Sequence, residues 1–198
     1  MKRDRETPAP WQSVKSAAGP DLKLFKIKHT WMKNPRNHQT MQRVVLESVD
    51  WVNVVALTAD RNVVVVRQFR FGTGTITTEV PGGMVDPGES PLEAATRELR
   101  EETGYTSSNW VYLGAVEPNP AFLNNLCHHY LAFPAEKTQQ CDLGDGEDIV
   151  VARLSLDELQ VEIENGYLRH ALALSALSRV FTLWTPKINF HAKRGSNL

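Results

Sequence analysis

The chain has 198 residues, of which 41% are hydrophobic and 23% are charged, and its formal net charge is −1. This length and composition are ordinary for a globular chain and predict one domain with extensions. The near-zero net charge argues against a general electrostatic attraction to nucleic acid or to an anionic membrane, so any phosphate binding must be local.

Cysteine usage and hydropathy indicate the cellular compartment. Cys127 and Cys141 have no metal-type spacing, and we expect reduced thiols, with a disulfide as the less favoured alternative. The first residues contain no apolar core of a secretory signal, and no later run approaches the roughly 18 apolar residues of a membrane span. These features predict a soluble, cytoplasmic protein.

The N-terminal region predicts a loose arm followed by strands. Residues 1–20 are rich in Pro, Lys, Arg and small residues, which favours little regular structure. Residues 21–32 alternate as a strand does, residues 34–38 predict a turn, and a second strand is expected at about residues 41–48. In residues 51–72, two valine-rich runs flank a short polar turn, which predicts a hairpin whose strands are buried on both faces.

A helix is predicted at about Pro91–Thr103, with its own start and stop signals. Ser90 and Glu93 form a capping box, Pro91 occupies the first helical position, and Gly104 stands where a left-handed C-terminal cap is expected. At about 100° per residue, one narrow apolar stripe should face the core. That stripe consists of Leu92, Ala95 and Leu99.

Beside the stripe, Glu98, Glu101 and Glu102 fall within one arc of the helix, with clear space expected around them. Like charges at these spacings repel by roughly 0.2 to 0.5 kcal/mol per pair, so a positive partner is expected. A divalent cation such as magnesium is one candidate, because it takes carboxylate oxygens. The alternative is a solvated acidic face neutralised by Arg97 and Arg100.

The second half of the chain predicts two strands, an acidic loop and two helices. A strand is expected at 110–117, and the polar group Asn124, Asn125 and His128 leads into another apolar strand. Residues 137–146 form a polar, glycine-containing loop that passes into a further strand through residues 147–154. Helices are predicted at 155–166 and 168–184, the second being structural. Mixed strands and helices in this order indicate the α/β class.

The stretch from Gly82 to Tyr105 resembles the Nudix box, G-x5-E-x7-R-E-U-x-E-E-x-G-U, where U is a bulky apolar residue. Tyr105 is the one soft match, since it replaces an aliphatic residue. Nine fixed positions at fixed spacings make a chance match very improbable. The matching residues are Gly83, Glu89, Arg97, Glu98, Leu99, Glu101, Glu102, Gly104 and Tyr105.

The resemblance implies a Nudix-type α/β/α sandwich with a mixed sheet and an N-terminal β-hairpin extension of the kind that ADP-ribose pyrophosphatases use for dimerisation. It divides the chain into an arm and dimerisation strand (1–40), a Nudix hydrolase domain (41–185) and a C-terminal tail (186–198). The implied partners are a nucleotide-sugar substrate and a second copy of the chain, with neither nucleic acid nor a membrane.

The resemblance also implies roles for residues of the box. Glu98, Glu101 and Glu102 bind Mg²⁺, with Mn²⁺ as a possible substitute, and Glu102 counts with Arg97 among the catalytic residues. Arg97 orients a glutamate by ion pairing, and Gly83 lets the loop pass close to the metal.

Outside the box, RQFRFG and TTEVPGG resemble signatures of the ADP-ribose and nucleotide-sugar branch. They imply that Arg70 contacts phosphate and that Glu79 is an extra metal ligand or supports one. The alternatives are an exposed arginine at a strand end and a loop cap. Pro120 is a weaker sign of the same branch.

Asn124, Asn125 and His128 look like a substrate loop of this branch, although His128 could instead be a hydrogen-bonded core histidine. A catalytic glutamate from a mobile acidic loop maps best onto Glu147, with Asp148 as the neighbouring alternative.

The expected activity is metal-dependent hydrolysis of the pyrophosphate bond of a nucleoside diphosphate sugar, such as ADP-ribose, to a nucleoside monophosphate and a sugar phosphate. Glu147 would be the base, because carboxylates bound to metal lose basicity. Trp51 or Trp31 could stack on the nucleobase, unless both belong to the core. The alternatives are hydrolysis of nucleoside triphosphates or capped RNA, and a non-catalytic nucleotide-sensing module.

Overall fold

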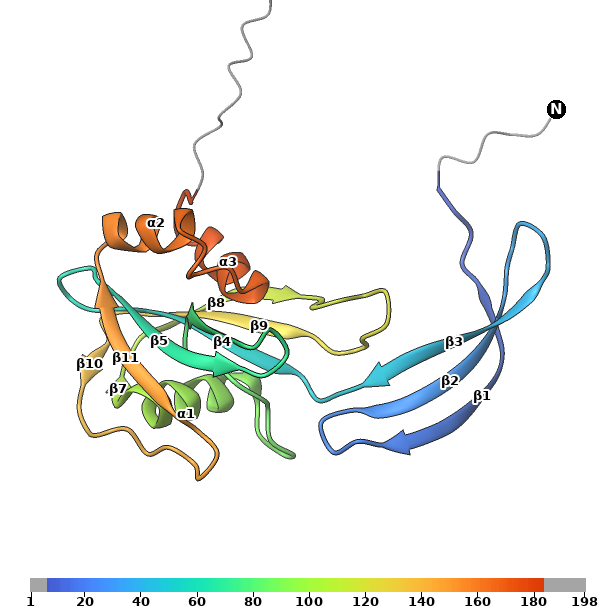
Figure 1. Ribbon diagram of the computed structural model, residues 1–198, viewed down its shortest axis with the longest axis horizontal. Helices are drawn as coiled ribbons and strands as arrows, with labels where there is room; N and C mark the ends of the chain where they lie inside the picture. The colour runs from blue at the N-terminus through green and yellow to red at the C-terminus, as the bar shows by residue number, and fades with distance from the viewer. Residues whose placement is uncertain (1–6, 184–198) are drawn as a thin grey trace, which may run out of the picture.

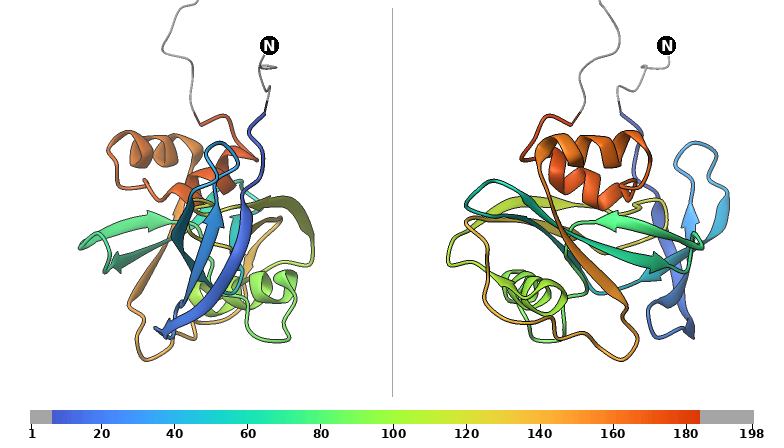
Figure 2. Two further views of the ribbon diagram at one scale, coloured as in Figure 1. Left: turned by 90° about the vertical axis from the view of Figure 1, so that its right-hand side faces the viewer. Right: turned by 60° about the vertical axis from the view of Figure 1, so that its left-hand side comes forward.

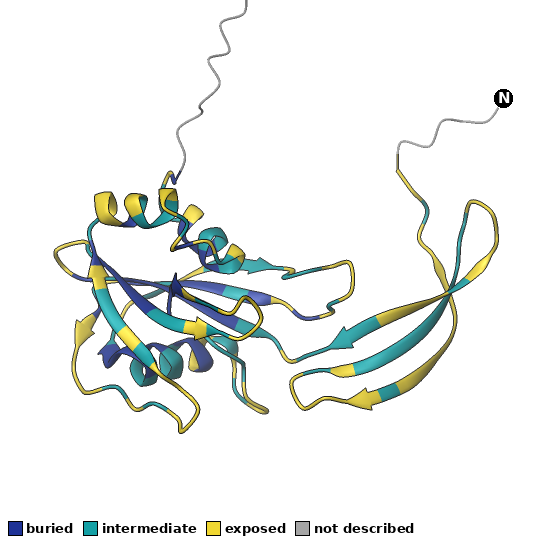
Figure 3. Cartoon of the chain, in the orientation of Figure 1, coloured by how far each residue is buried: buried dark blue, intermediate teal, exposed yellow. Residues whose placement is uncertain are grey.

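The computed structural model describes residues 7–183. It consists of an N-terminal three-stranded sheet that stands beside an α/β/α sandwich (Figure 1). Strands β1 (Gln12–Asp21), β2 (Lys26–Lys33) and β3 (Thr40–Glu47) pair antiparallel in the order β1-β2-β3. None of the residues in these three strands is buried (Figure 3).

The N-terminal sheet corrects one prediction and extends another. The predicted hairpin is present as β2 and β3, joined by a turn at residues 35–37. The loose arm expected at residues 1–20 is wrong for residues 12–20, which belong to β1. These residues carry no alternating apolar pattern, but the free edge of β2 offers hydrogen-bonding groups along its length, and that pairing decides their conformation. The sheet spans residues 12–47 and so extends past residue 40.

The central sheet is mixed, as predicted. Five strands follow in the order β11-β5-β4-β9-β8, and the sixth strand, β6, pairs with β5. Strands β4 and β9 are parallel, whereas the other pairs are antiparallel. The strands are β4 (Trp51–Leu57), β5 (Val63–Arg70), β6 (Thr75–Glu79), β8 (Trp110–Val116), β9 (Cys127–Ala132) and β11 (Ile149–Leu154); β7 (Tyr105–Thr106) and β10 (Glu136–Lys137) form a separate small pair.

Helices cover both faces of the central sheet. Helix α1 (Pro91–Thr103) lies on one face, and α2 (Leu156–Glu164) and α3 (Ala171–Ser178) lie on the other (Figures 1 and 2). The valines of β4 and β5 point alternately into the two layers, so both strands are buried on both faces as their continuous apolar runs predicted. None of the helices in residues 7–183 is long and apolar enough to cross a membrane.

Helix α1 begins and ends where its capping signals predicted. Ser90 and Glu93 form the capping box, and Gly104 adopts a left-handed conformation with φ of 73°. Two details differ from expectation. Leu92, in the first turn, is 41% exposed, and Glu102 is only 4% exposed because it lies in the middle of the packed face. The carboxylate arc therefore does not have clear space around it.

The C-terminal helices are shorter than the sequence suggests. Helix α2 starts from a capping box at Ser155, as expected, whereas α3 starts only at Ala171. The residues before α3 form hydrogen bonds with β6 and do not continue the helix. The C-terminal tail predicted at residues 186–198 lies outside the described residues.

Candidate active site

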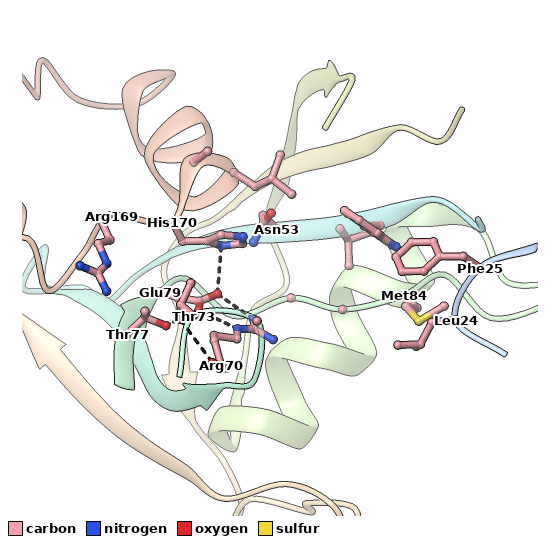
Figure 4. Close-up of a pocket in the computed structure, with 17 residues that line it drawn as sticks. Leu24, Phe25, Asn53, Arg70, Thr73, Thr77, Glu79, Met84, Arg169 and His170 are labelled. Atoms are coloured by element: carbon pink, nitrogen blue, oxygen red, sulfur yellow. Dashed lines mark hydrogen bonds and ion pairs between the residues drawn. The ribbon is translucent and has the colours of Figure 1, made fainter. Parts of the chain in front are cut away.

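A pocket of about 790 Å³ lies between the β1–β2 turn, the start of β4, the β5–β6 hairpin and the start of α3 (Figure 4). One part of its wall is apolar and the other part is polar. The apolar part includes Leu24, Phe25, Trp51 and Met84, and the polar part includes Arg70, Thr77, Glu79, Arg169 and His170. Gly82 and Gly83, in the loop before α1, complete the wall.

Arg70 and Glu79 form a bidentate ion pair in the polar part. Arg70 donates from Nε to Glu79 Oε1 and from Nη2 to Oε2, both at 2.7 Å. Burial by itself would raise the pKa of Glu79, which is 1% exposed, but donors from Arg70, His170 and Thr77 outweigh burial and hold the pKa far below its usual value. Glu79 is therefore an ionised carboxylate beneath the pocket.

Arg97 is the hub of the carboxylates on and before α1. Its Nε and Nη2 donate to the two oxygens of Glu89, each at 3.0 Å. Its Nη1 donates to Glu98 at 2.9 Å and to Glu101 at 3.3 Å, and its Nη2 also donates to the Met84 carbonyl at 2.9 Å. Arg97 thus ties the glycine loop to the helix and orients two of the predicted metal ligands.

Two carboxylates of α1 resist ionisation where they lie. Burial raises the pKa of Glu102 to about 8, and the charges of Glu98 and Glu147 add to this effect although the Gly82 N–H donates to Glu102 at 2.9 Å. Burial also raises the pKa of Glu98 despite its ion pair with Arg97. A cation placed between them would stabilise the ionised form of both carboxylates.

The residues fit a hard divalent cation by donor type, charge and packing. Gly83 passes so close to Glu98 that a Cβ there would overlap the carboxylate. In residues 7–183 no three acidic, imidazole or thiol groups are arranged to enclose an ion, and Arg97 engages Glu98 and Glu101. Enclosing an ion therefore requires these flexible side chains to rearrange around it.

Glu147 lies near this cluster, in the exposed loop between β10 and β11. Its charge contributes to raising the pKa values of Glu98 and Glu102. The Gly144 N–H donates to Glu147 Oε2 at 2.9 Å. The backbone of the same loop is joined to α1, because the Asp142 N–H donates to the carbonyl of Glu101 at 2.8 Å.

The predicted substrate loop does not line the pocket. Asn124 accepts from the Ser48 N–H at 3.1 Å, and buried Asn125 donates to the Val49 carbonyl at 3.0 Å. His128 contacts Asp50 at 3.1 Å and the Tyr112 hydroxyl at 3.0 Å. These contacts join the loop to the segment that precedes β4.

Of the other predicted substrate contacts, Trp51 lines the pocket and Pro120 does not. Pro120 is an exposed turn residue. Trp51 lines the pocket, whereas Trp31 lies on β2 beneath the Lys15 ammonium. Of the two candidate tryptophans, Trp51 is thus the one beside Arg70 and Glu79.

The pocket also contains residues that the sequence did not single out, namely Leu24, Phe25, Arg169 and His170. Leu24 and Phe25 lie in the turn between β1 and β2, whereas the sequence predicted a strand across residues 21–32. His170 is the N-cap residue of α3, but its side chain makes no capping hydrogen bond. No short motif marks Arg169 or His170, so only the fold brings them to the site.

The chain is similar in sequence to one protein family and to individual proteins. Residues 49–176, more than half of the chain, match the family described as NUDIX domain. The chain is 32% identical over 123 residues to the methanol dehydrogenase activator of Bacillus methanolicus, a match that covers 62% of this chain and 66% of that protein, just under two thirds. It is 28% identical over 164 residues to the ADP-ribose pyrophosphatase of Mycobacterium tuberculosis, with 82% and 79% covered.

A crystal structure of an ADP compounds hydrolase has the same fold, with a TM-score of 0.76 and 20% identity over 89% of this chain and 95% of that chain.

Proposed function

The chain belongs to the NUDIX domain family, and we propose on that premise that it is a pyrophosphohydrolase that cleaves nucleoside diphosphate sugars, ADP-ribose or a related compound. The observation that carries the proposal is the pocket itself, in which an apolar wall containing Trp51 and Phe25 adjoins Arg70 and the glycine loop. That loop in turn contacts the carboxylates of Glu98 and Glu102. An elongated substrate with a flat base and a charged pyrophosphate matches this division.

Each part of the wall has a separate task in this proposal. Trp51 offers an aromatic face on which the nucleobase stacks. Arg70 keeps N–H groups beyond those that it donates to Glu79, and these suit phosphate oxygens. The ADP-ribose pyrophosphatase of M. tuberculosis, which matches 82% of this chain, supports the choice of substrate class.

Glu98, Glu101 and Glu102 would hold the divalent cation beside the pyrophosphate. Magnesium or manganese, when bound, would neutralise charge on the phosphate oxygens and lower the pKa of bound water. Arg97 keeps Glu98 and Glu101 on the side of the helix that faces the glycine loop. The Gly82 N–H holds Glu102 in the same place from the other end of that loop.

Glu147 accepts the proton of the attacking water. The water oxygen then bonds to one phosphorus of the pyrophosphate, the bond from that phosphorus to the bridging oxygen breaks, and the products are a nucleoside monophosphate and a sugar phosphate. Glu147 suits this role because it is exposed on a loop close to Glu98 and Glu102. Asp148 is the neighbouring alternative.

The test is one panel of ADP-ribose, other nucleotide sugars, nucleoside triphosphates and capped RNA, assayed with magnesium and with manganese. We expect kcat/KM to be highest for a nucleotide sugar, with a nucleoside monophosphate among the products. A preference for triphosphates or capped RNA would replace the proposed substrate class. Tight nucleotide binding without turnover of any substrate would indicate a sensing module instead.

We also propose that the protein is a homodimer in which the N-terminal sheet packs on a second copy. The strands of this sheet bury no residue within the chain, and its region exposes Trp11, Val14, Leu22, Leu24 and Val44 (Figure 3). A sheet this small depends for its stability on a hydrophobic face or on packing against another element.

Charge supports the same arrangement. Residues 7–48 contain seven Lys and Arg against two Asp and Glu, whereas residues 49–183 contain nine against nineteen. The basic N-terminal sheet of one copy is therefore expected to attract the acidic domain of the other copy. Light scattering at micromolar concentration should give twice the mass of the chain, and a monomer would rule the dimer out. The cytoplasmic location and the exclusion of nucleic acid and membrane partners stay predictions.

A further inference from the structure

Both oxygens of the Glu79 carboxylate are engaged by protein groups. Oε1 accepts from Arg70 Nε at 2.7 Å and from Thr77 Oγ1 at 2.5 Å. Oε2 accepts from Arg70 Nη2 at 2.7 Å, and His170 Nδ1 lies 2.9 Å from it. The His170 contact has the distance of an ion pair but not the alignment of a full hydrogen bond. A carboxylate has about four acceptor positions, and here protein groups surround them all.

The occupied oxygens assign Glu79 to holding Arg70. A metal ion could reach Glu79 only if one of its present partners left. Arg70, in contrast, uses two of its five N–H groups on Glu79, which leaves three for a ligand in the pocket. The hydrogen bonds that Arg70 donates to Glu79 raise the pKa of Arg70, and the charges of Glu79 and Glu102 add to this effect, so the guanidinium lies near the carboxylate cluster.

His170 is held over Glu79 by contacts between β6 and the segment before α3. The Thr78 N–H donates to the Tyr167 carbonyl at 2.9 Å, and Arg169 Nη2 donates to the Thr75 hydroxyl at 3.0 Å. The His170 side chain points to Glu79 and away from the helix end that an N-cap side chain ordinarily serves (Figure 4). The polar contact of the His170 side chain is therefore with Glu79 and not with the end of α3.

We propose that His170 is a positioning residue, which fixes the Glu79 carboxylate so that Arg70 presents its free N–H groups to the substrate pyrophosphate. The inference rests on the proposed function, because it assigns the ligand of Arg70. Displacements of up to about 1 Å at a reacting group change rates by roughly 10- to 100-fold. We expect a loss of kcat/KM in that range when His170 is truncated.

The experiment compares His170→Ala with His170→Asn. The asparagine Nδ2 stands one bond from Cγ, as the histidine Nδ1 does, so it can replace the contact to Glu79. His170→Ala should lower kcat/KM for the best nucleotide sugar about 10- to 100-fold, and His170→Asn should recover to within about threefold of the wild type. A matched control is His38→Asn, in the exposed β2–β3 turn, where a φ of 60° suits asparagine.

A double-mutant cycle with Arg70→Ala shows whether His170 acts through Arg70. In the Arg70→Ala background, His170→Ala should have less than about a threefold further effect, because residues of one network are not additive. A full additional loss in that background, or an asparagine variant as impaired as the alanine variant, would overturn the inference.

A crystal structure of His170→Ala separates this inference from the proposed function. The inference expects the Arg70–Glu79 pair to be displaced or dissociated whether or not the wild type hydrolyses nucleotide sugars. An unchanged bidentate pair would refute it. If His170→Ala fails to fold, the same comparison is made with His170→Gln, whose amide lies one bond too far from the backbone to reproduce the contact. Inactivity of the wild type on every nucleotide sugar would instead refute the proposed function.

Discussion

Gly83 packs directly against the Glu98 carboxylate, and Gly83→Ala tests this contact. A methyl carbon at this position would overlap Glu98 Oε1 and lie 2.5 Å from Cδ, whereas ordinary van der Waals contact is 3.4–4 Å. The carboxylate must therefore move by about 1 Å, and a misplacement of that size costs roughly 100-fold in rate. Because the group that moves is the end of a flexible side chain, the free energy of unfolding should change little.

Gly82→Ala is the matched comparison, because a methyl group there meets the backbone carbonyl of Val52, which cannot move away. It should lower the free energy of unfolding by about 1–3 kcal/mol or more. Steady-state kinetics with magnesium, urea unfolding and magnesium titration are measured for both variants. Gly83→Ala should lose kcat/KM and magnesium affinity while its unfolding midpoint stays close to that of the wild type. Wild-type kinetics in Gly83→Ala would refute the assignment of Glu98 as a ligand held against this loop.

The remaining predictions concern three side chains. Glu147→Gln should lower kcat by roughly two to four orders of magnitude with little change in substrate or magnesium affinity. Loss of magnesium binding would make Glu147 a ligand, and near-normal turnover would transfer the base role to Asp148 or to a carboxylate of α1. Glu102→Gln should nearly abolish turnover. Because the folded-state pKa of Glu102 is raised to about 8, the metal-free protein should lose thermal stability as pH rises from about 4.5 to 8, and Glu102→Gln should flatten this dependence in a pH series of melting curves. Trp51→Ala should raise KM by roughly 5- to 150-fold, the range of base stacking, and an unchanged KM would remove Trp51 from nucleobase binding.

Residues close together in the chain determined most of what the sequence predicted well. The boundaries of α1 follow from Ser90, Glu93 and Gly104, whose capping hydrogen bonds span three or four residues. The valine runs of β4 and β5 are apolar at consecutive positions, and only a strand buried on both faces accommodates that pattern. The spacing of the box glutamates likewise places them on one side of a single helix.

Tertiary structure decided the features that depend on partners far along the chain. Strand β1 forms because β2 offers a free edge, and its own residues carry no strand pattern. Asn124 and Asn125 hydrogen-bond to the backbone of Ser48 and Val49, 76 residues away, although their polarity also suited a substrate loop. A polar side chain shows in the sequence that it needs a partner but not which one.

The candidate active site likewise combines features that the local sequence specifies with pairings that it does not specify. The sequence by itself determined the helix with its carboxylates, the glycine loop and the presence of Arg70 and Glu79, because local spacing and residue chemistry specify them. Only the fold decided that Arg70 and Glu79 pair with each other, that Glu102 is buried, and that His170, 91 positions after Glu79, closes the same cluster. Burial and pairing depend on which surfaces the packed layers cover, and no residue carries that information in its own neighbourhood.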